Sequence, residues 1–255
     1  MAPAAEAREA KRALAAFARP AGTFDAARYF RDTNGLAFYN VGTDRVRTMA
    51  RAIAERHKSD WTVRDAVAFA NALITDKHLE AKGLGVEVLA RFRRQFTPAL
   101  LPTWKRWLST NHSANWATTD TICGLLIGPL VAAHPELASN LARWAGDRNL
   151  WVRRASIVGL IPIVRRGSGL DILYRTARTL HLDQEDLIQK AVGWALREAG
   201  KADMDRLERY LRENGPRIPR TTVRYAIERF PPRQRRELLV TTRAPDEDRK
   251  WAPRR

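Results

Sequence analysis

The sequence predicts an all-α fold, and two observations carry that prediction. Apolar residues recur at helical spacing, three or four positions apart, through nearly the whole chain, and Gly, Pro, Asn and Asp punctuate the breaks. No segment alternates apolar and polar residues with period two for long enough to form a strand. The chain is therefore expected to build its core from helix packed on helix.

The helices are expected in the following order. Residues 1–19 form a short amphipathic helix that ends at Arg19-Pro20, and Phe24–Arg31 forms another before Asn34-Gly35. From about residue 44 the pattern is regular. Its segments are 44–57, 62–75, 79–95, 97–108, 115–133, 136–146, 149–165, 168–180, 183–199, 203–213, 219–229 and 232–241.

The spacing of the helices predicts an array of helical pairs. The first helix of each pair starts near residue 79, 115, 149, 183 or 219, which gives separations of 36, 34, 34 and 36 residues. A fixed period of this size is typical of a solenoid, and the tetratricopeptide signature is not in register. We therefore expect a right-handed α-solenoid of short HEAT-like helical repeats with a basic concave face. It forms one domain over 1–241, with N-terminal helices in 1–35 and a flexible tail over 242–255.

The charge of the chain indicates a polyanionic partner. Its 255 residues carry 45 Lys plus Arg against 28 Asp plus Glu, a formal net charge of +17. Such a balance suits nucleic acid or an anionic membrane surface. Because no stretch approaches the roughly 20 apolar residues of a membrane span and no signal peptide is visible, we expect no membrane partner. The protein is expected to be cytoplasmic and nucleoid-associated.

Equivalent positions in the repeats bring charged residues to one level. With Arg154 as reference, the neighbouring repeats place Asp120, Lys190 and Arg224 there. One acid and three bases would thus line one wall, where a basic stripe seats a phosphate backbone. Trp194 lies one turn beyond Lys190.

Two interpretations of the acid and its tryptophans stay open on spacing alone. Asp120 is either an ion-pair partner of a neighbouring base or a group kept for chemistry, because a carboxylate opposes phosphate binding. Trp116, one turn before Asp120, and Trp194 are either core residues or ligand contacts. Periodicity alone favours the first interpretation in both cases, and the shared repeat position weakens that preference. The single cysteine, Cys123, is expected to be buried packing, and neither metal-ligand spacing nor a Gly-rich loop implies a cofactor.

Three motifs resemble one known family. They are Asn115-Trp116-x-x-x-Asp120, then Asn149-x-Trp151-x-x-Arg154, then Gln189-Lys190-Ala191-Val192-Gly193-Trp194-x-Leu196-Arg197-Glu198. In this order they are similar to the AlkD-type DNA glycosylases of the DNA alkylation repair family. The similarity extends to Tyr39–Arg47 and to Arg220–Ile227, and so covers most of residues 25–230.

The resemblance implies a HEAT-like solenoid that excises N3- and N7-alkylpurines from duplex DNA. It implies that Asp120 is catalytic, that Trp116 and Trp194 contact the damaged nucleotide, and that Arg154 grips phosphate. The other predicted DNA-binding residues are Arg153, Lys190, Arg197, Arg224 and Arg47. The sequence departs from the family pattern at Asn115, at Ala117 and over residues 75–80, which concerns lesion range more than fold.

The predicted chemistry needs a single carboxylate. An N3- or N7-alkylated purine is cationic and leaves without protonation, while oxocarbenium character builds on the sugar, where a carboxylate stabilises it. Indole rings attract the cation by about 0.5–2 kcal/mol. We therefore expect a monomeric, cofactor-free DNA glycosylase that cleaves the N-glycosidic bond without full base flipping, as the resemblance implies. The alternatives are a non-catalytic HEAT-repeat nucleic-acid-binding protein and a protein-binding scaffold.

Overall fold

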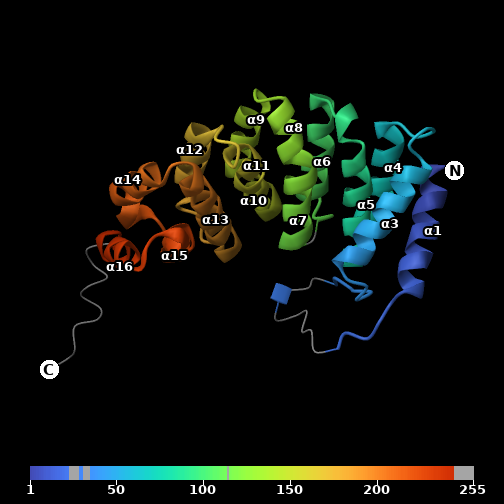
Figure 1. The fold of residues 1–255 in the computed structure, drawn as a ribbon, viewed down its shortest axis with the longest axis horizontal. Coiled ribbons are helices and arrows are strands. Elements are labelled where there is room, and N and C mark those ends of the chain that lie inside the picture. Colours follow the sequence, from blue (N-terminus) through green and yellow to red (C-terminus); the bar gives the residue numbers. More distant parts are fainter. Residues whose placement is uncertain (23–28, 31–34, 114, 244–255) are drawn as a thin grey trace. The chain divides into compact units, whose positions relative to one another are not determined.

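The computed structural model describes residues 1–22, 29–30, 35–113 and 115–243 (Figure 1). Over these residues the α-helices are α1 (Pro3–Ala16), α3 (Thr43–Arg56), α4 (Val63–Ile74), α5 (Leu79–Arg91), α6 (Leu101–Ser109), α7 (Trp116–Ile122), α8 (Gly128–Ala133), α9 (Leu137–Arg143), α10 (Leu150–Val158), α11 (Ile161–Val164), α12 (Leu170–Leu180), α13 (Asp186–Ala202), α14 (Met204–Asn214), α15 (Arg220–Ala226) and α16 (Pro232–Thr241). Short 3-10 turns η1 (Arg93–Gln95), η2 (Pro98–Leu100), η4 (Trp144–Gly146), η5 (Gly215–Arg217) and η6 (Ile227–Arg229) join them, with a π turn, η3 (Cys123–Ile127). The all-α prediction is confirmed: the described ranges hold helices and one isolated β-bridge, Ala37 to His78.

The chain divides into two compact units, residues 1–134 (unit 1) and 135–255 (unit 2). The predicted single repeat domain over 1–241 stays a prediction. The expected helix over Phe24–Arg31 lies mostly outside the described residues, as does the expected tail from residue 244 on.

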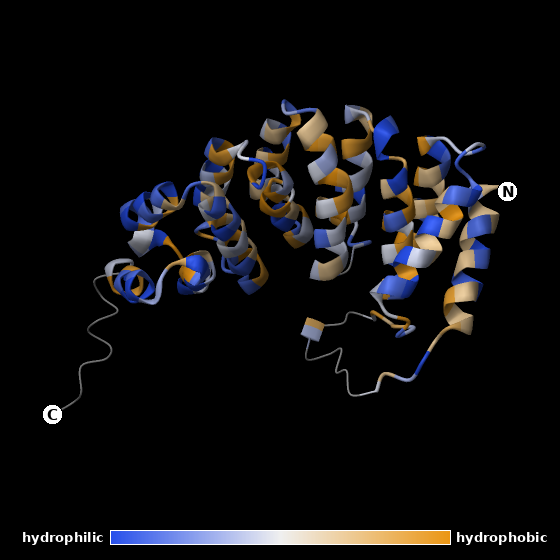
Figure 2. Ribbon diagram, viewed as in Figure 1, coloured by the Kyte–Doolittle hydropathy of each residue, from blue (hydrophilic) through white to orange (hydrophobic). Residues whose placement is uncertain are grey.

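Unit 1 is built around α5, which contacts α1, α3, α4, α7 and the π turn. Eight of its thirteen residues are buried, on nearly every side of the helix, among them Leu84, Val88 and Leu89. Figure 2 shows that hydrophobic segments follow hydrophilic ones along the neighbouring helices. Trp104 and Trp107 of α6 are also fully buried core residues.

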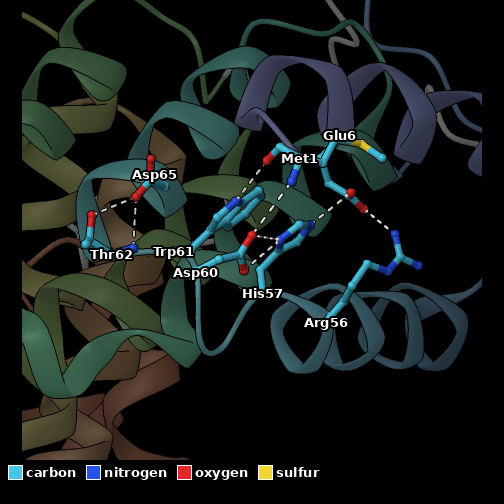
Figure 3. A network of polar contacts seen from close by, with 8 residues as sticks. All are labelled: Met1, Glu6, Arg56, His57, Asp60, Trp61, Thr62 and Asp65. Atoms are coloured by element: carbon cyan, nitrogen blue, oxygen red, sulfur yellow. Dashed lines mark hydrogen bonds and ion pairs between the residues drawn. The ribbon is translucent and has the colours of Figure 1, made fainter.

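A buried polar network fixes α1 against the end of α3 (Figure 3). The His57 ring lies between two carboxylates, 3.0 Å from Oε2 of Glu6 and 3.1 Å from Oδ2 of Asp60. It stacks on Trp61 with ring centroids 4.1 Å apart. Arg56 donates to the other oxygen of Glu6 at 2.8 Å. Because Glu6 and His57 are both about 2% exposed, these contacts satisfy polar groups that would otherwise be costly to bury.

Unit 2 is built around α13, which contacts α10, α11, α12, α14 and α15. Its closest neighbour is α15. A Cβ added at Gly193 would lie 2.7 Å from the carbonyl oxygen of Thr222 and closer still to Cβ of Tyr225. Thr222 in turn donates from its hydroxyl to the carbonyl of Gln189 at 2.9 Å. The two backbones therefore approach to a distance that only glycine permits at this position.

Two helices differ from the predicted ones because of proline. The predicted helix over 149–165 is broken between Val158 and Ile161, since Pro162 has no N–H to continue the helical ladder and begins α11 instead. The predicted helix over 115–133 exists, but Cys123–Ile127 winds as a π turn ahead of Pro129. The spacing of apolar residues in the sequence predicts neither the break before Pro162 nor the π turn.

The helix Trp116–Ala133 corrects one expectation. By length and composition it could cross a membrane, with a mean hydropathy of 1.3 over 18 residues, so one stretch does come near the required length. Half of it is buried inside the structure, where α7 and the π turn pack on α5. The apolar residues on the buried side are those expected of a helix that packs in a protein core.

The buried His181 of unit 2 gives a pH-dependent stability. Its Nε2 lies 2.9 Å from the hydroxyl oxygen of Tyr210. Burial, together with the positive charges of Arg178 and Arg217, lowers the pKa of His181 to about 4. Between pH 6.5 and 4 the unfolded chain therefore binds a proton that the folded chain does not, so the folded state loses stability as the pH falls.

We expect the free energy of unfolding to fall by up to about 2 kcal/mol between pH 7 and pH 5 on account of this residue. Urea unfolding of the wild type and of His181→Gln at both pH values measures it, because glutamine keeps a hydrogen-bonding group and does not titrate. An equal pH dependence in the two proteins would show that His181 is protonated when folded.

Candidate nucleic-acid interface

The tryptophans fall into two groups by burial. The chain has eight, of which Trp251 lies outside the described residues. Four are buried core residues: Trp61, Trp104, Trp107 and Trp144. The remaining three, Trp116, Trp151 and Trp194, are partly exposed, and each belongs to one of the three sequence motifs. An amphipathic ring kept partly in water at three separate motifs is available to a ligand.

Asn115 fixes the start of the helix that carries Trp116 and Asp120. Its side-chain oxygen accepts from the backbone N–H of Thr118 at 2.8 Å, and its amide nitrogen donates to the carbonyl of Ser113 at 2.9 Å. This is N-cap geometry, and it explains why asparagine is suited to the position that departs from the family pattern. Trp116 and Asp120 follow one turn apart on α7, both partly exposed.

The π turn begins three residues after Asp120. The N–H of Gly128 donates to the carbonyl of Cys123, five residues back. Pro129 follows and supplies no N–H of its own, so the wider turn accommodates the proline without ending the helix. Single π turns occur often beside functional sites. Cys123 itself is buried, as expected.

Aromatic side chains that the sequence predictions did not name surround Trp116. Its ring centroid is 5.3 Å from that of Tyr29 and 5.7 Å from that of Phe30, and Phe38 stacks on Phe30 at 5.6 Å. Phe30 is buried, whereas Tyr29 is 55% exposed. Tyr29 and Trp116 therefore present adjacent ring surfaces, and Trp116 lies one helical turn from Asp120. The signal available in the sequence was the aromatic pair Tyr29-Phe30 followed by Phe38, which no periodicity connects to residue 116.

The segment that carries Phe38 is attached to the start of α5. Glu80 accepts from the backbone N–H groups of Tyr39 and Asn40 at 3.0 and 2.6 Å. The ring of His78 stacks on that of Tyr39 at 3.9 Å. Residues 75–80, which depart from the family pattern, thus have a structural role here.

Lys82 holds the loop that leads into α7. Its ammonium donates to the carbonyl of Ile74, at the C-terminal end of α4, and to the carbonyl of His112, both at 2.7 Å. Burial lowers its pKa to about 8, against an opposing effect of Asp76. A cation at a helix C-terminus is favourable, and the two contacts tie α4, α5 and the loop before Trp116 together.

Arg153 and Arg154 of α10 are both engaged within unit 2. Arg154 is 5% exposed and donates to the carbonyl of Leu187 in α13. Arg153 donates to Asp183 at 2.6 Å and to the carbonyls of Asp147 and Arg148 at 3.1 and 2.9 Å. Their predicted role in binding phosphate stays a prediction, and the structure adds that both guanidinium groups connect α10 to neighbouring segments.

Lys190, Trp194 and Arg197 lie on one side of α13, at successive turns of the helix. The ammonium of Lys190 is 2.7 Å from Oδ2 of Asp186. Arg197 contacts two acids, Glu198 with an Nε to Oε1 distance of 3.7 Å and Glu228 of η6 through Nη1. The predicted grouping of these three residues on one face of the helix is what the structure shows.

Glu198 is the buried centre of a cluster of cations. It is 2% exposed and accepts from Nε of Arg165 at 2.8 Å and from Nζ of Lys201 at 2.7 Å. Burial raises its pKa, but the two hydrogen bonds outweigh that effect, so that its pKa is lowered and it stays ionised. A carboxylate held in this way is structural.

The remaining predicted DNA-binding residues are exposed. Arg224 on α15 has no ion-pair partner among the residues that the structure describes. Arg47 on α3 is 57% exposed, with Nε 3.4 Å from Oε1 of Glu87. Exposed, weakly held guanidinium groups are available to phosphate at little cost.

The structure thus brings the predicted site residues together in two sets. Trp116 and Asp120 share α7 in unit 1, where Arg47 also lies, and the other predicted residues belong to unit 2. A common surface for Asp120 and Trp194 stays a prediction. In the described part of the chain no group of His, Cys, Asp and Glu residues is arranged to hold a metal ion.

The comparison with known families decides what these motifs belong to. A family model described as "DNA alkylation repair enzyme" matches residues 10–230. The chain belongs to this family. The family resemblance seen in the sequence is therefore confirmed, and a function in alkylation-damage repair with DNA as partner follows from it.

A solved structure gives the fold of the family. The chain is similar to a predicted DNA alkylation repair enzyme from Enterococcus faecalis, with a TM-score of 0.69 and 16% sequence identity. The similarity covers 81% of this chain and 93% of that one. Identity this low shows the fold alone, and the fold is the helical repeat fold of DNA alkylation repair proteins. No curated protein sequence matches the chain.

Proposed function

We propose that this member of the DNA alkylation repair family is a monofunctional DNA glycosylase that excises cationic N3- and N7-alkylated purines from duplex DNA. The observation that carries the proposal is the arrangement on α7, where Asp120 lies one turn from the partly exposed Trp116, whose ring contacts that of Tyr29. A carboxylate one turn from an aromatic pair suits a substrate that is cationic and becomes cationic at the sugar as it reacts.

The reaction breaks the bond between C1′ and the purine nitrogen. The bonding electrons move to the purine, whose positive charge is thereby neutralised, and positive charge develops on C1′ and the ring oxygen of the sugar. Asp120 stabilises that charge and orients a water molecule. The water oxygen bonds to C1′ and its proton is released, which leaves an abasic site. No general acid is required, because the leaving base is already cationic.

Binding is assigned to the aromatic and basic residues named above. Trp116 and Trp194 contact the damaged nucleotide, and Arg154, Arg153, Lys190, Arg197, Arg224 and Arg47 serve the phosphate backbone, either directly or by positioning neighbouring segments. The alkylated nucleotide is proposed to react without full base flipping, and the protein to act as a monomer at the nucleoid. A formal net charge of +17 supports attraction to any duplex.

The test is release of free base from methylated duplex. We expect N7-methylguanine or N3-methyladenine to be released in excess of spontaneous depurination when the protein is incubated with DNA treated with a methylating agent. The same assay with bulkier N7 adducts defines the lesion range. Salt-sensitive duplex binding with no release on any of these substrates would instead identify a non-catalytic DNA-binding protein, and weak DNA binding beside capture of an acidic protein would identify a scaffold.

A further inference from the structure

The cations of unit 2 differ in how firmly their partner acids hold them. Arg153 pairs with Asp183, which is 9% exposed, and Arg165 pairs with the buried Glu198. A cation that left such a buried acid for a phosphate would leave the charge of the acid without compensation. These ion pairs are permanent parts of the fold.

Glu228 is different. It is 51% exposed, lies on η6 and contacts Nη1 of Arg197, which stands 31 residues away on α13. Removing this contact leaves Glu228 in water, so the exchange costs little. A carboxylate that contacts a guanidinium through hydrogen bonds resembles a phosphate oxygen in charge and in acceptor geometry.

Other residues predicted to contact DNA lie close to Glu228 or Arg197 along their helices. Arg224 stands four residues before it and has no ion-pair partner among the described residues. Trp194 lies three residues before Arg197, one turn along α13. The Nε of Arg197 is buried, makes no hydrogen bond among the described residues and lies 3.7 Å from Oε1 of Glu198, so the contact with Glu228 is the one that Arg197 makes to an exposed acid.

From these contacts we propose that Glu228 occupies the phosphate-binding position of Arg197 in the free protein, and that a DNA phosphate displaces it on binding. The proposal rests on the proposed function only in taking Arg197 as a phosphate contact. Glu228 thereby lowers affinity for every duplex equally, since a phosphate contact carries no sequence or lesion information. A family member that must leave undamaged DNA quickly gains by such weakening of its nonspecific binding.

The experiment measures binding of undamaged duplex by Glu228→Gln, which keeps the shape of the side chain and removes its charge. We expect the dissociation constant at low salt to fall roughly two- to fivefold relative to the wild type. The plot of log affinity against log salt should also steepen, by less than the roughly 0.9 of one full phosphate contact.

Glu213→Gln is the matched control. Glu213 is exposed on α14 of the same unit, has no ion-pair partner among the described residues, and its substitution changes the net charge by the same amount. We expect a smaller effect from it. A gain as large as that of Glu228→Gln would show that only net charge matters, and the proposal would then be wrong.

A second pair of variants tests whether phosphate displaces Glu228 from Arg197 or whether Glu228 holds Arg197 in place for binding. In an Arg197→Ala background, Glu228→Gln should give no gain beyond the control, because no guanidinium remains to be freed. If Glu228→Gln weakens binding instead, the acid holds Arg197 in its active position and the proposal is overturned. Because undamaged DNA is used, these outcomes do not depend on base release, so a failure of the proposed glycosylase activity is recognised separately in the excision assay.

Discussion

Asp120→Asn is expected to reduce single-turnover excision of N7-methylguanine by about a hundredfold or more, which corresponds to roughly 3 kcal/mol of transition-state stabilisation. The substitution keeps the size of the side chain and removes the charge that would stabilise the developing oxocarbenium ion. Affinity for undamaged duplex should stay the same or increase, because a carboxylate repels phosphate. Quench experiments with enzyme in excess give the rate, and titration of a labelled duplex gives the affinity.

The contrast between rate and affinity is what identifies a catalytic role. If Asp120 were only an ion-pair partner within unit 1, its substitution would lower the stability of the protein and leave the rate of the folded fraction nearly unchanged. Thermal unfolding of both proteins provides this control. Equal rates for folded wild type and folded variant would remove Asp120 from the mechanism.

Gly193→Ala is expected to destabilise unit 2 by about 2 kcal/mol. The added methyl group would lie 2.7 Å from the carbonyl oxygen of Thr222 and nearer to Cβ of Tyr225, neither of which is the end of a flexible side chain. Overpacking of this kind typically costs 1–3 kcal/mol or more, and it outweighs the roughly 1 kcal/mol that alanine gains in a helix interior. Chemical denaturation of the two proteins measures the difference.

Gly200→Ala on the same helix is the control for this prediction. There the nearest atom to an added Cβ is Cδ2 of Leu207, the end of a side chain that can rotate away. We expect a distinctly smaller loss. Equal losses at the two positions would mean that α13 and α15 separate readily, and that the close approach at Gly193 is not maintained in solution.

Much of the fold could be predicted because helical periodicity is a property of local sequence. The helices over 63–74 and 232–241, for example, lie within a residue or two of the predicted segments. Changes of winding could not be predicted in the same way, since the π turn at 123–127 and the break before Pro162 leave the apolar spacing almost unaltered. Periodicity reports which side of a helix is buried and not how its backbone is hydrogen-bonded.

The candidate site shows the same division. The motifs predicted that Trp116 and Trp194 would be available to a ligand, and both are partly exposed; Trp151 is partly exposed as well, although nothing was predicted for it. They did not predict Tyr29 beside Trp116, because that contact joins residues 87 positions apart through tertiary packing. Nor did they predict that Arg153 and Arg154 would be engaged by a carboxylate and by carbonyls, because one sequence shows which residues are charged and not which groups neutralise them.

The π turn has a consequence for how α7 is oriented. A residue added to an α-helix advances it by about 100°, so a five-residue turn in place of a four-residue one rotates everything before it relative to everything after it. With α8 held by its own packing, an unbroken α-helix would carry Trp116 and Asp120 about 100° away from where they lie. The wide turn at Cys123–Ile127 therefore rotates the start of the helix, which carries the proposed catalytic residues, relative to its end, which packs in the core.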